Sequence, residues 1–195
     1  MSTSAPGHSM QALSPSPWIV RHACLIPSGA RVLDLACGQG RHARWLGERG
    51  CRVLAVDRDT VALAALSGAP GVETAAVDLE SDAWPLAGAR FDAIVATNYL
   101  HRPLFPHLLA ALADDGALLY ETFARGNEAF GRPASPAFLL EPGELLRIVA
   151  GRLNVVAYEE GRITREGRDS VVQRIAAVGP GRAWPPMLPP ACPAD

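Results

Sequence analysis

A short segment of the chain, DLACGQG at 34–40, combines an acidic residue with two glycines. Asp34 lies inside an apolar run, and Gly38 and Gly40 follow in a turn that leads into a helical pattern. Because glycine has no β-carbon, backbone N–H groups in such a turn can approach a ligand closely. A carboxylate at this place can attract an ammonium group, such as that of a methionine moiety, directly or through water. The segment is therefore expected to bind a polar, nucleotide-like ligand.

Two further acidic residues end the next two apolar runs of the chain. Asp57 comes about twenty residues after the glycine turn, where a carboxylate can accept hydrogen bonds from both hydroxyls of a ribose. Arg58 would then flank an adenine. Asp78 suits the adenine amine and Leu79 the face of the ring, although Asp78 taken alone also fits a turn-forming or capping aspartate.

These residues together resemble the class I S-adenosylmethionine-dependent methyltransferase family, and more closely its small single-domain bacterial members of the tellurite-resistance and thiopurine type. The resemblance covers about residues 16–178, with FDAIVATNYL (91–100) as its fourth motif. Ala36 stands where the family usually has its first glycine and adds one methyl group. The resemblance implies S-adenosyl-L-methionine as the cofactor, no metal, and methyl transfer as the activity. The predicted cofactor-binding residues are Asp34, Ala36, Gly38, Gly40, Arg41, Asp57, Arg58, Asp78, Leu79, Thr97 and Asn98.

Two alternatives to a methyltransferase stay open. GQGRHA also matches G-x-G-x-x-A, a weak fingerprint of nicotinamide and flavin sites. That motif does not require an acidic residue four positions before the glycine, as Asp34 precedes Gly38. A NAD(P)-dependent oxidoreductase is thus less favoured, and a non-catalytic adenosyl-binding or interaction protein is the other alternative.

Apolar runs alternate with helical patterns through most of the chain, which predicts an α/β fold with parallel strands joined by crossover helices. The last two apolar runs are separated by a polar segment too short for a crossover helix, so they are expected to form an antiparallel hairpin. As in the family it resembles, the chain should form a Rossmann-like, mostly parallel seven-stranded sheet with helices on both faces. The predicted strands are 31–36, 52–57, 72–78, 91–97, 117–123, 153–160 and 170–178, and the predicted helices are 41–49, 60–67, 103–114 and 142–151.

Ligands of open parallel sheets bind at the carboxyl ends of the strands, so the segments after the fourth and fifth strands should face the transferable methyl group. Tyr99 and His101 are the predicted catalytic residues, with His101 as a base or, alternatively, a solvated loop histidine. The stretch 123–132 is predicted to be a lid over a small, anionic substrate, or an ordinary connecting loop. The predicted substrate-binding residues are Arg102, Glu121, Arg125, Asn127 and Arg132.

The composition limits the other classes of function. All eighteen basic residues are arginine, so Schiff-base chemistry, phosphate-loop NTPases and protein kinases are excluded, because each needs a lysine. A formal net charge of -2 without a basic cluster disfavours nucleic acid as a partner. The four cysteines show neither the spacing of a zinc site nor that of a disulfide framework.

The chain of 195 residues fits one domain, at 16–178, between a flexible N-terminus at 1–15 and a proline-rich disordered tail at 179–195. No apolar run reaches the ~18 residues of a membrane helix, and the first residues lack a signal-peptide pattern. A cytoplasmic protein that acts on a small-molecule methyl acceptor, without a membrane partner, is therefore expected. The identity of that acceptor and the oligomeric state do not follow from the sequence.

Overall fold

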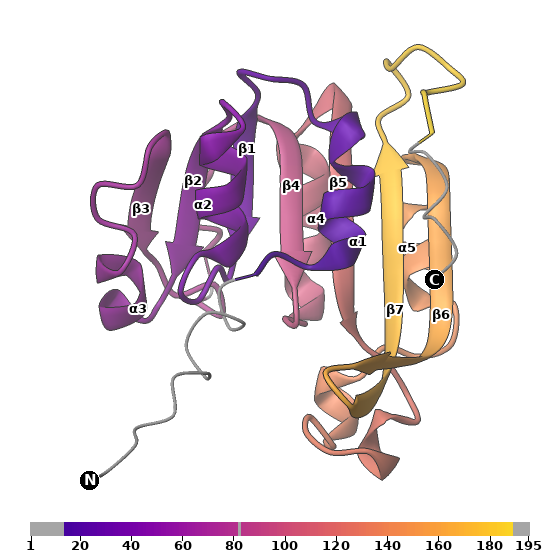
Figure 1. Ribbon diagram of the computed structural model, residues 1–195. Helices are drawn as coiled ribbons and strands as arrows, with labels where there is room; N and C mark the ends of the chain where they lie inside the picture. Colours follow the sequence, from indigo (N-terminus) through magenta and orange to yellow (C-terminus); the bar gives the residue numbers. More distant parts are fainter. Residues whose placement is uncertain (1–13, 82, 189–195) are drawn as a thin grey trace, which may run out of the picture.

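The computed structural model describes residues 14–81 and 83–188, and its centre is a seven-stranded sheet in the order β3-β2-β1-β4-β5-β7-β6 (Figure 1). Neighbouring strands from β3 to β5 are parallel, and β7 pairs antiparallel with both β5 and β6. The expected α/β fold with a C-terminal antiparallel hairpin is confirmed. The strands are β1 (Arg31–Leu35), β2 (Arg52–Asp57), β3 (Val72–Ala76), β4 (Phe91–Thr97), β5 (Leu112–Phe123), β6 (Asn154–Arg165) and β7 (Arg168–Val178).

Short helices cover both faces of the sheet. Figure 1 shows α1 and α2 in front of the strands and α4 and α5 behind them. Asp59 caps the helix that begins at Thr60, because its side chain accepts hydrogen bonds from the backbone N–H groups of Val61 and Ala62. The helices are α1 (Pro17–His22), η2 (Ala23–Leu25), α2 (Arg41–Glu48), α3 (Thr60–Ala64), η3 (Arg102–Leu104), α4 (Phe105–Ala111), η4 (Asn127–Ala129), η5 (Pro136–Phe138) and α5 (Glu144–Val149).

The sheet separates two hydrophobic clusters. Successive residues of a strand point to opposite faces, so Val32 packs in the cluster under α1 and α2, while Leu33 packs in the cluster under α4 and α5. Both side chains are fully buried. The central strands therefore read as continuous apolar runs, as expected for a parallel sheet with two covered faces.

The boundary between α4 and β5 differs from the sequence prediction. The helix ends at Ala111, and β5 begins at Leu112, which pairs with Phe91. The residues between the predicted helix and the predicted strand lie inside β5, where the register shifts before Ala117, which pairs with Ala93. Leu112 is itself a buried core residue, so its side chain extends the strand in place of the helix.

The terminal hairpin is longer than predicted. The polar segment GRITREGRD continues both strands, except for a two-residue turn at Glu166 and Gly167, whose φ values are 51° and 73°. Two positive φ values fit the primed turns that match the twist of a two-stranded ribbon. The end of the hairpin consequently reaches past the sheet and lies beside the segment that follows β5 (Figure 1).

The first residues of the predicted tail are attached to the start of β5. Gly179 and Gly181 donate backbone hydrogen bonds to the oxygens of Gly116 and Asp114, each at 2.8 Å. Residues 1–13 and 189–195, on which the other predictions for the termini depend, lie outside the described residues. Among the helices of 14–81 and 83–188, none has the length and apolar character needed to cross a bilayer.

Candidate functional site

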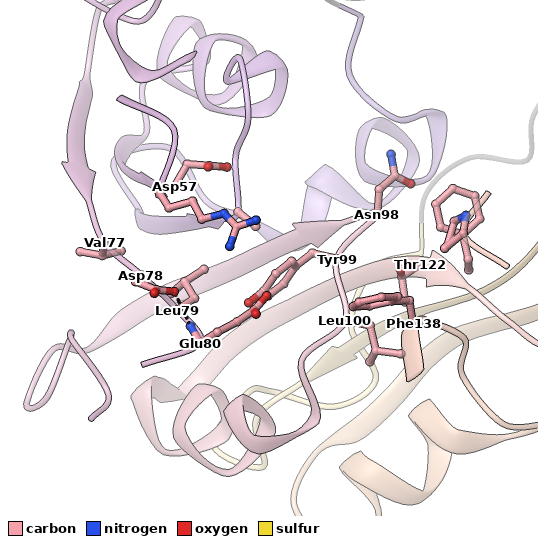
Figure 2. Close-up of a pocket in the computed structure, with 14 residues that line it drawn as sticks. Asp57, Val77, Asp78, Leu79, Glu80, Asn98, Tyr99, Leu100, Thr122 and Phe138 are labelled. Carbon is pink, nitrogen blue, oxygen red and sulfur yellow. Dashed lines mark hydrogen bonds between the residues drawn. The ribbon is translucent and has the colours of Figure 1, made fainter. Parts of the chain in front are cut away.

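A cavity of about 370 Å³ opens at the carboxyl ends of the parallel strands. Its two ends differ in chemistry: carboxylates gather where β2 and β3 end, and uncharged side chains line the part that follows β5 (Figure 2). This is the edge of an open α/β sheet at which ligands bind. The lining residues are Ala36, Asp57, Arg58, Val77, Asp78, Leu79, Glu80, Asn98, Tyr99, Leu100, Thr122, Phe123, Pro133 and Phe138.

The two glycines in the turn between β1 and α2 have different surroundings. Both have positive φ, 54° at Gly38 and 71° at Gly40. A β-carbon at Gly40 would lie 2.3 Å from a methyl carbon of Leu66, whereas one at Gly38 would meet nothing within 4 Å. Gly40 thus permits close packing of the turn on Leu66, which follows α3, and Gly38 keeps the backbone open on its outer side.

Two residues that are not glycine also adopt left-handed backbone conformations at the cavity. Ala36 has φ 51° at the end of β1, and Asn98 has φ 57° at the end of the adjacent β4. Both line the cavity. Such conformations are costly for residues with a β-carbon and cluster at functional sites. The family's usual glycine at position 36 is explained by this backbone, which alanine here adopts.

Asp57 connects the end of β2 to the glycine turn. One carboxylate oxygen accepts from the N–H of Gly38 at 2.8 Å, and the other accepts from the N–H of Asp59 at 3.0 Å. Each oxygen has a further lone pair. Because the side chain also lines the cavity, the carboxylate is available to ribose hydroxyls.

Asp34 lies beneath the turn and is not among the residues that line the cavity. Its carboxylate is buried and accepts a 2.9 Å hydrogen bond from the N–H of Ala43, in the first turn of α2. Burial raises the pKa of Asp34 to about 7. The carboxylate thus fixes the junction between turn and helix, and its predicted contact with a cofactor ammonium group remains a prediction.

Asp78 forms a turn and lines the cavity, and its contact with an adenine amine remains a prediction. Its side chain accepts from the N–H of Glu80 at 2.9 Å, which forms a turn, and it also lines the cavity next to Leu79. Arg41 and Thr97 lie outside the lining and contact each other, with 3.3 Å between the guanidinium and the hydroxyl.

The two predicted catalytic residues are placed differently. Tyr99 lines the cavity, but its ring points toward Asp78, Leu79 and Glu80 and away from Phe138 (Figure 2). Burial, together with the nearby carboxylates, raises the pKa of Tyr99 to about 12, so the phenol is protonated at neutral pH. His101 does not line the cavity and precedes η3.

Arg102, a predicted substrate-binding residue, is held by α5 and the loop before it. Its guanidinium forms two hydrogen bonds with the Glu144 carboxylate, at 2.7 and 2.9 Å, and donates to the oxygen of Leu139 at 2.9 Å. These contacts raise the pKa of Arg102 and lower that of Glu144. Arg102 thus connects η3 to α5 and to the loop before α5, and it does not line the cavity.

Glu121 is fully buried at the end of β5 and is also outside the lining. Arg165, from the tip of the hairpin, donates to both carboxylate oxygens at 2.8 Å, and the hydroxyl of Ser16 donates to one of them at 3.1 Å. A buried carboxylate requires such partners. Glu121 therefore joins the N-terminal segment, β5 and the hairpin.

The segment after β5, predicted as a lid, is anchored through Asn127. The buried amide donates to the oxygen of Pro133 at 2.9 Å and accepts from the N–H of Val171 at 3.1 Å. Arg125 pairs with Glu141, and Arg132 lies at a neighbouring hollow. Asn127 thereby fixes Pro133 in the cavity wall.

Sequence reasoning missed the uncharged wall of the cavity. The four residues of this wall lie in or next to segments that were expected near the acceptor, but the predicted substrate-binding residues were polar or charged; the wall consists of Thr122, Phe123, Pro133 and Phe138. Nothing in the types of these residues distinguishes them from core or loop positions. Only the folded chain shows that they share one surface.

Residues 32–116 match the family model described as a methyltransferase domain. This stretch of the chain therefore has the sequence of a methyltransferase domain, and the fold described above is the Rossmann-like fold of such domains. Over 79 residues this methyltransferase domain is 42% identical to a ribosomal RNA small subunit methyltransferase C of Chromohalobacter salexigens; the match covers 39% of the chain and 23% of that relative. The chain thus spans under a quarter of this curated relative.

Two solved structures share the fold of the methyltransferase domain. TehB from Haemophilus influenzae aligns with a TM-score of 0.69 and 22% identity, covering 83% of this chain and 61% of that one. The N-methyltransferase NodS from Bradyrhizobium japonicum, in complex with S-adenosylhomocysteine, aligns with a TM-score of 0.61 and 16% identity, covering 89% and 93%. At these identities the likeness is one of fold.

The cavity of the methyltransferase domain fits the adenosyl cofactor of its class. Asp57, the residue predicted to bind the ribose, has free lone pairs, and the backbone beside Gly38 is open. Asp78 and Leu79 offer an acceptor and an apolar surface at the next strand end. Asp57, Asp78, Leu79 and the glycine turn would hold S-adenosylmethionine, the cofactor of the class.

Proposed function

We propose that this protein transfers a methyl group from S-adenosylmethionine to a small, uncharged acceptor bound at Thr122, Phe123, Pro133 and Phe138. The observation that carries the proposal is the continuity of this uncharged wall with the carboxylate end of the same cavity. A ligand that binds to Asp57 and Asp78 would lie next to the uncharged wall. The total volume, about 370 Å³, favours a small acceptor over an extended polymer.

The chain supplies binding, orientation and exclusion of water. S-adenosylmethionine supplies an activated methyl group on a sulfonium. The apolar faces of Phe123, Pro133 and Phe138 hold an acceptor and displace water from it, and orientation of this kind can carry much of the rate of a displacement. Among the residues that line the cavity there is no histidine, and the Tyr99 phenol is protonated at neutral pH. An acceptor that needs no protein base, such as a thiol, suits this surface.

Ribosomal RNA is a second candidate acceptor, because the match to a ribosomal RNA methyltransferase favours it. The matched 79 residues are a minor part of that relative, and the formal net charge of -2 here does not favour a polyanion. The two acceptors can be separated by experiment. Purified protein is incubated with S-adenosylmethionine and either a panel of uncharged small molecules or small ribosomal subunits, and S-adenosylhomocysteine production is measured.

We expect turnover with members of the small-molecule panel and none with ribosomal subunits. Phe138→Asp places a charge in the acceptor wall and should abolish that turnover while S-adenosylhomocysteine still binds. Turnover on ribosomal subunits alone would replace the small-molecule proposal. Failure of the wild-type protein to bind S-adenosylhomocysteine in calorimetry would overturn methyl transfer altogether.

A further inference from the structure

Tyr99 carries a buried hydroxyl that has no hydrogen-bond partner among the described residues. Buried hydroxyls in folded proteins nearly always have a partner, and leaving one without costs free energy. This one belongs to a residue that lines the cavity. An unpartnered group at a binding cavity indicates a contact that a ligand completes.

The order of the strands indicates which part of a bound cofactor would contact the Tyr99 hydroxyl. The glycine turn follows β1, Asp57 ends β2, and Asp78 follows β3, the outermost of the three strands. A nucleoside with its ribose at Asp57 and the rest of the cofactor toward the glycine turn has its base at the end of β3. Tyr99 points to this end, toward Asp78 and Glu80, and its phenol lies within the influence of both carboxylates (Figure 2).

We propose that the hydroxyl of Tyr99 binds the hydrogen-bonding edge of the cofactor's adenine, an inference that rests on the proposed function. A carboxylate such as that of Asp78 accepts hydrogen bonds, which suits the exocyclic amine of adenine. The ring nitrogens of adenine are acceptors and require a donor, which the Tyr99 hydroxyl is. Tyr99 is then a cofactor-binding residue and not a catalyst at the acceptor.

The Glu80 side chain extends toward the hydroxyl of Tyr99 (Figure 2). Glu80 is exposed, and in the described structure its carboxylate forms no hydrogen bond. The side chain can therefore rotate away when a base enters. The hydroxyl of Tyr120 donates a 2.7 Å hydrogen bond to the main-chain oxygen of Tyr99 and so fixes the backbone from which the ring extends.

The experiment is calorimetric titration of wild-type protein, Tyr99→Phe and Glu80→Ala with two ligands. S-adenosylhomocysteine is the complete product, and 5′-methylthioadenosine carries the base and ribose without the amino-acid end. Tyr99→Phe should weaken both ligands equally, by about 3- to 12-fold, the range for one hydrogen bond. Glu80→Ala should leave both affinities within twofold. Tyr158→Phe is the matched control, because its hydroxyl bonds to Glu160 and it does not line the cavity.

A second measurement is the Tm of the ligand-free protein, which Tyr99→Phe should not lower although it weakens ligand binding. Removing an unpartnered buried hydroxyl should leave the Tm of the ligand-free protein unchanged or raise it, whereas a structural hydroxyl would lower it. Unchanged affinity in Tyr99→Phe, a loss for S-adenosylhomocysteine alone, or an equal loss in Glu80→Ala would each overturn the inference. Absence of binding by the wild-type protein would instead overturn the proposed function, so the two failures are distinguishable.

Discussion

The hydroxyl of Tyr120 donates a 2.7 Å hydrogen bond to the main-chain oxygen of Tyr99. Tyr120 is fully buried in β5, and its ring packs against Phe105 of α4. The contact therefore fixes the segment after β4, where cavity residues follow one another, to the core of the domain. One buried phenol thus determines the position of another that lines the site.

Tyr120→Phe should destabilise the domain, because the Tyr99 oxygen is left without this donor. We expect the free energy of unfolding to fall by about 1–3 kcal/mol, the cost of an unsatisfied buried group. Urea denaturation followed by circular dichroism measures it. An unchanged midpoint would mean that water replaces the hydroxyl.

Asp57→Ala should weaken S-adenosylhomocysteine by about 1.5–3 kcal/mol, the range for hydrogen bonds to a charged group. Asp57→Asn keeps an acceptor for the Gly38 N–H and should lose less. Asp59→Asn is the control, since asparagine also caps a helix and residue 59 does not line the cavity. Equal affinity of Asp57→Ala and wild type in calorimetry would remove the ribose role.

Alanine at the two turn glycines should have different consequences. Gly40→Ala places a β-carbon 2.3 Å from Leu66, so it should lower the Tm by several degrees. Gly38→Ala meets no atom within 4 Å and should cost only backbone strain of about 1 kcal/mol. Differential scanning calorimetry of both variants tests this, and a larger loss at Gly38 contradicts it.

His42 should make the protein sensitive to acid. Its ring is buried and accepts a 3.0 Å hydrogen bond from the N–H of Ser16, and burial lowers its pKa to about 3 from 6.5. Between these two values the unfolded chain binds the proton and the folded chain does not, so the free energy of unfolding falls as the pH falls from about 6.5 to about 3. The slope from this group is at most about 1.4 kcal/mol per pH unit.

His42→Gln keeps a hydrogen-bond acceptor and removes the titration. The variant should show a shallower loss of stability than the wild type below pH 6.5, and no such difference in slope near pH 8. Urea titrations at several pH values measure the two slopes. Parallel curves would show that His42 is protonated in the folded protein.

Asp34 should release a proton when a ligand with an ammonium group binds beside it. Its pKa is raised to about 7 by burial, and a nearby cation lowers that pKa, so part of the population loses its proton at pH 7. Calorimetry in buffers of different ionisation enthalpy should show release with S-adenosylhomocysteine and little with 5′-methylthioadenosine, which lacks the ammonium group. Equal release with both ligands would exclude Asp34 as the source.

The sequence predicts the ends of β1, β2 and β4 to within one residue, because these strands are buried and apolar on both faces, and Asp57 stands out as an acid at the end of such a run. It predicts the partners of side chains poorly. Glu121 resembled a substrate contact, but Arg165 neutralises it from 44 residues away along the chain. An ion pair across strands has no local pattern.

The direction of Tyr99 was equally inaccessible from the sequence. Position 99 is near an acceptor along the chain, yet the left-handed backbone at Asn98 turns the next side chain toward Asp78. The motif placed Tyr99 near the ends of β4 and β5, but only the folded backbone shows the direction of its side chain.

The place of β7 between β5 and β6 has a consequence for biosynthesis. β7 is translated last of the strands, and the indole of Trp18, among the first described residues, donates to the oxygen of Ile175 in it. Until residue 178 leaves the ribosome, β5 has an unpaired edge that can pair with other chains. A nascent chain stalled before β7 is therefore a natural client for a chaperone.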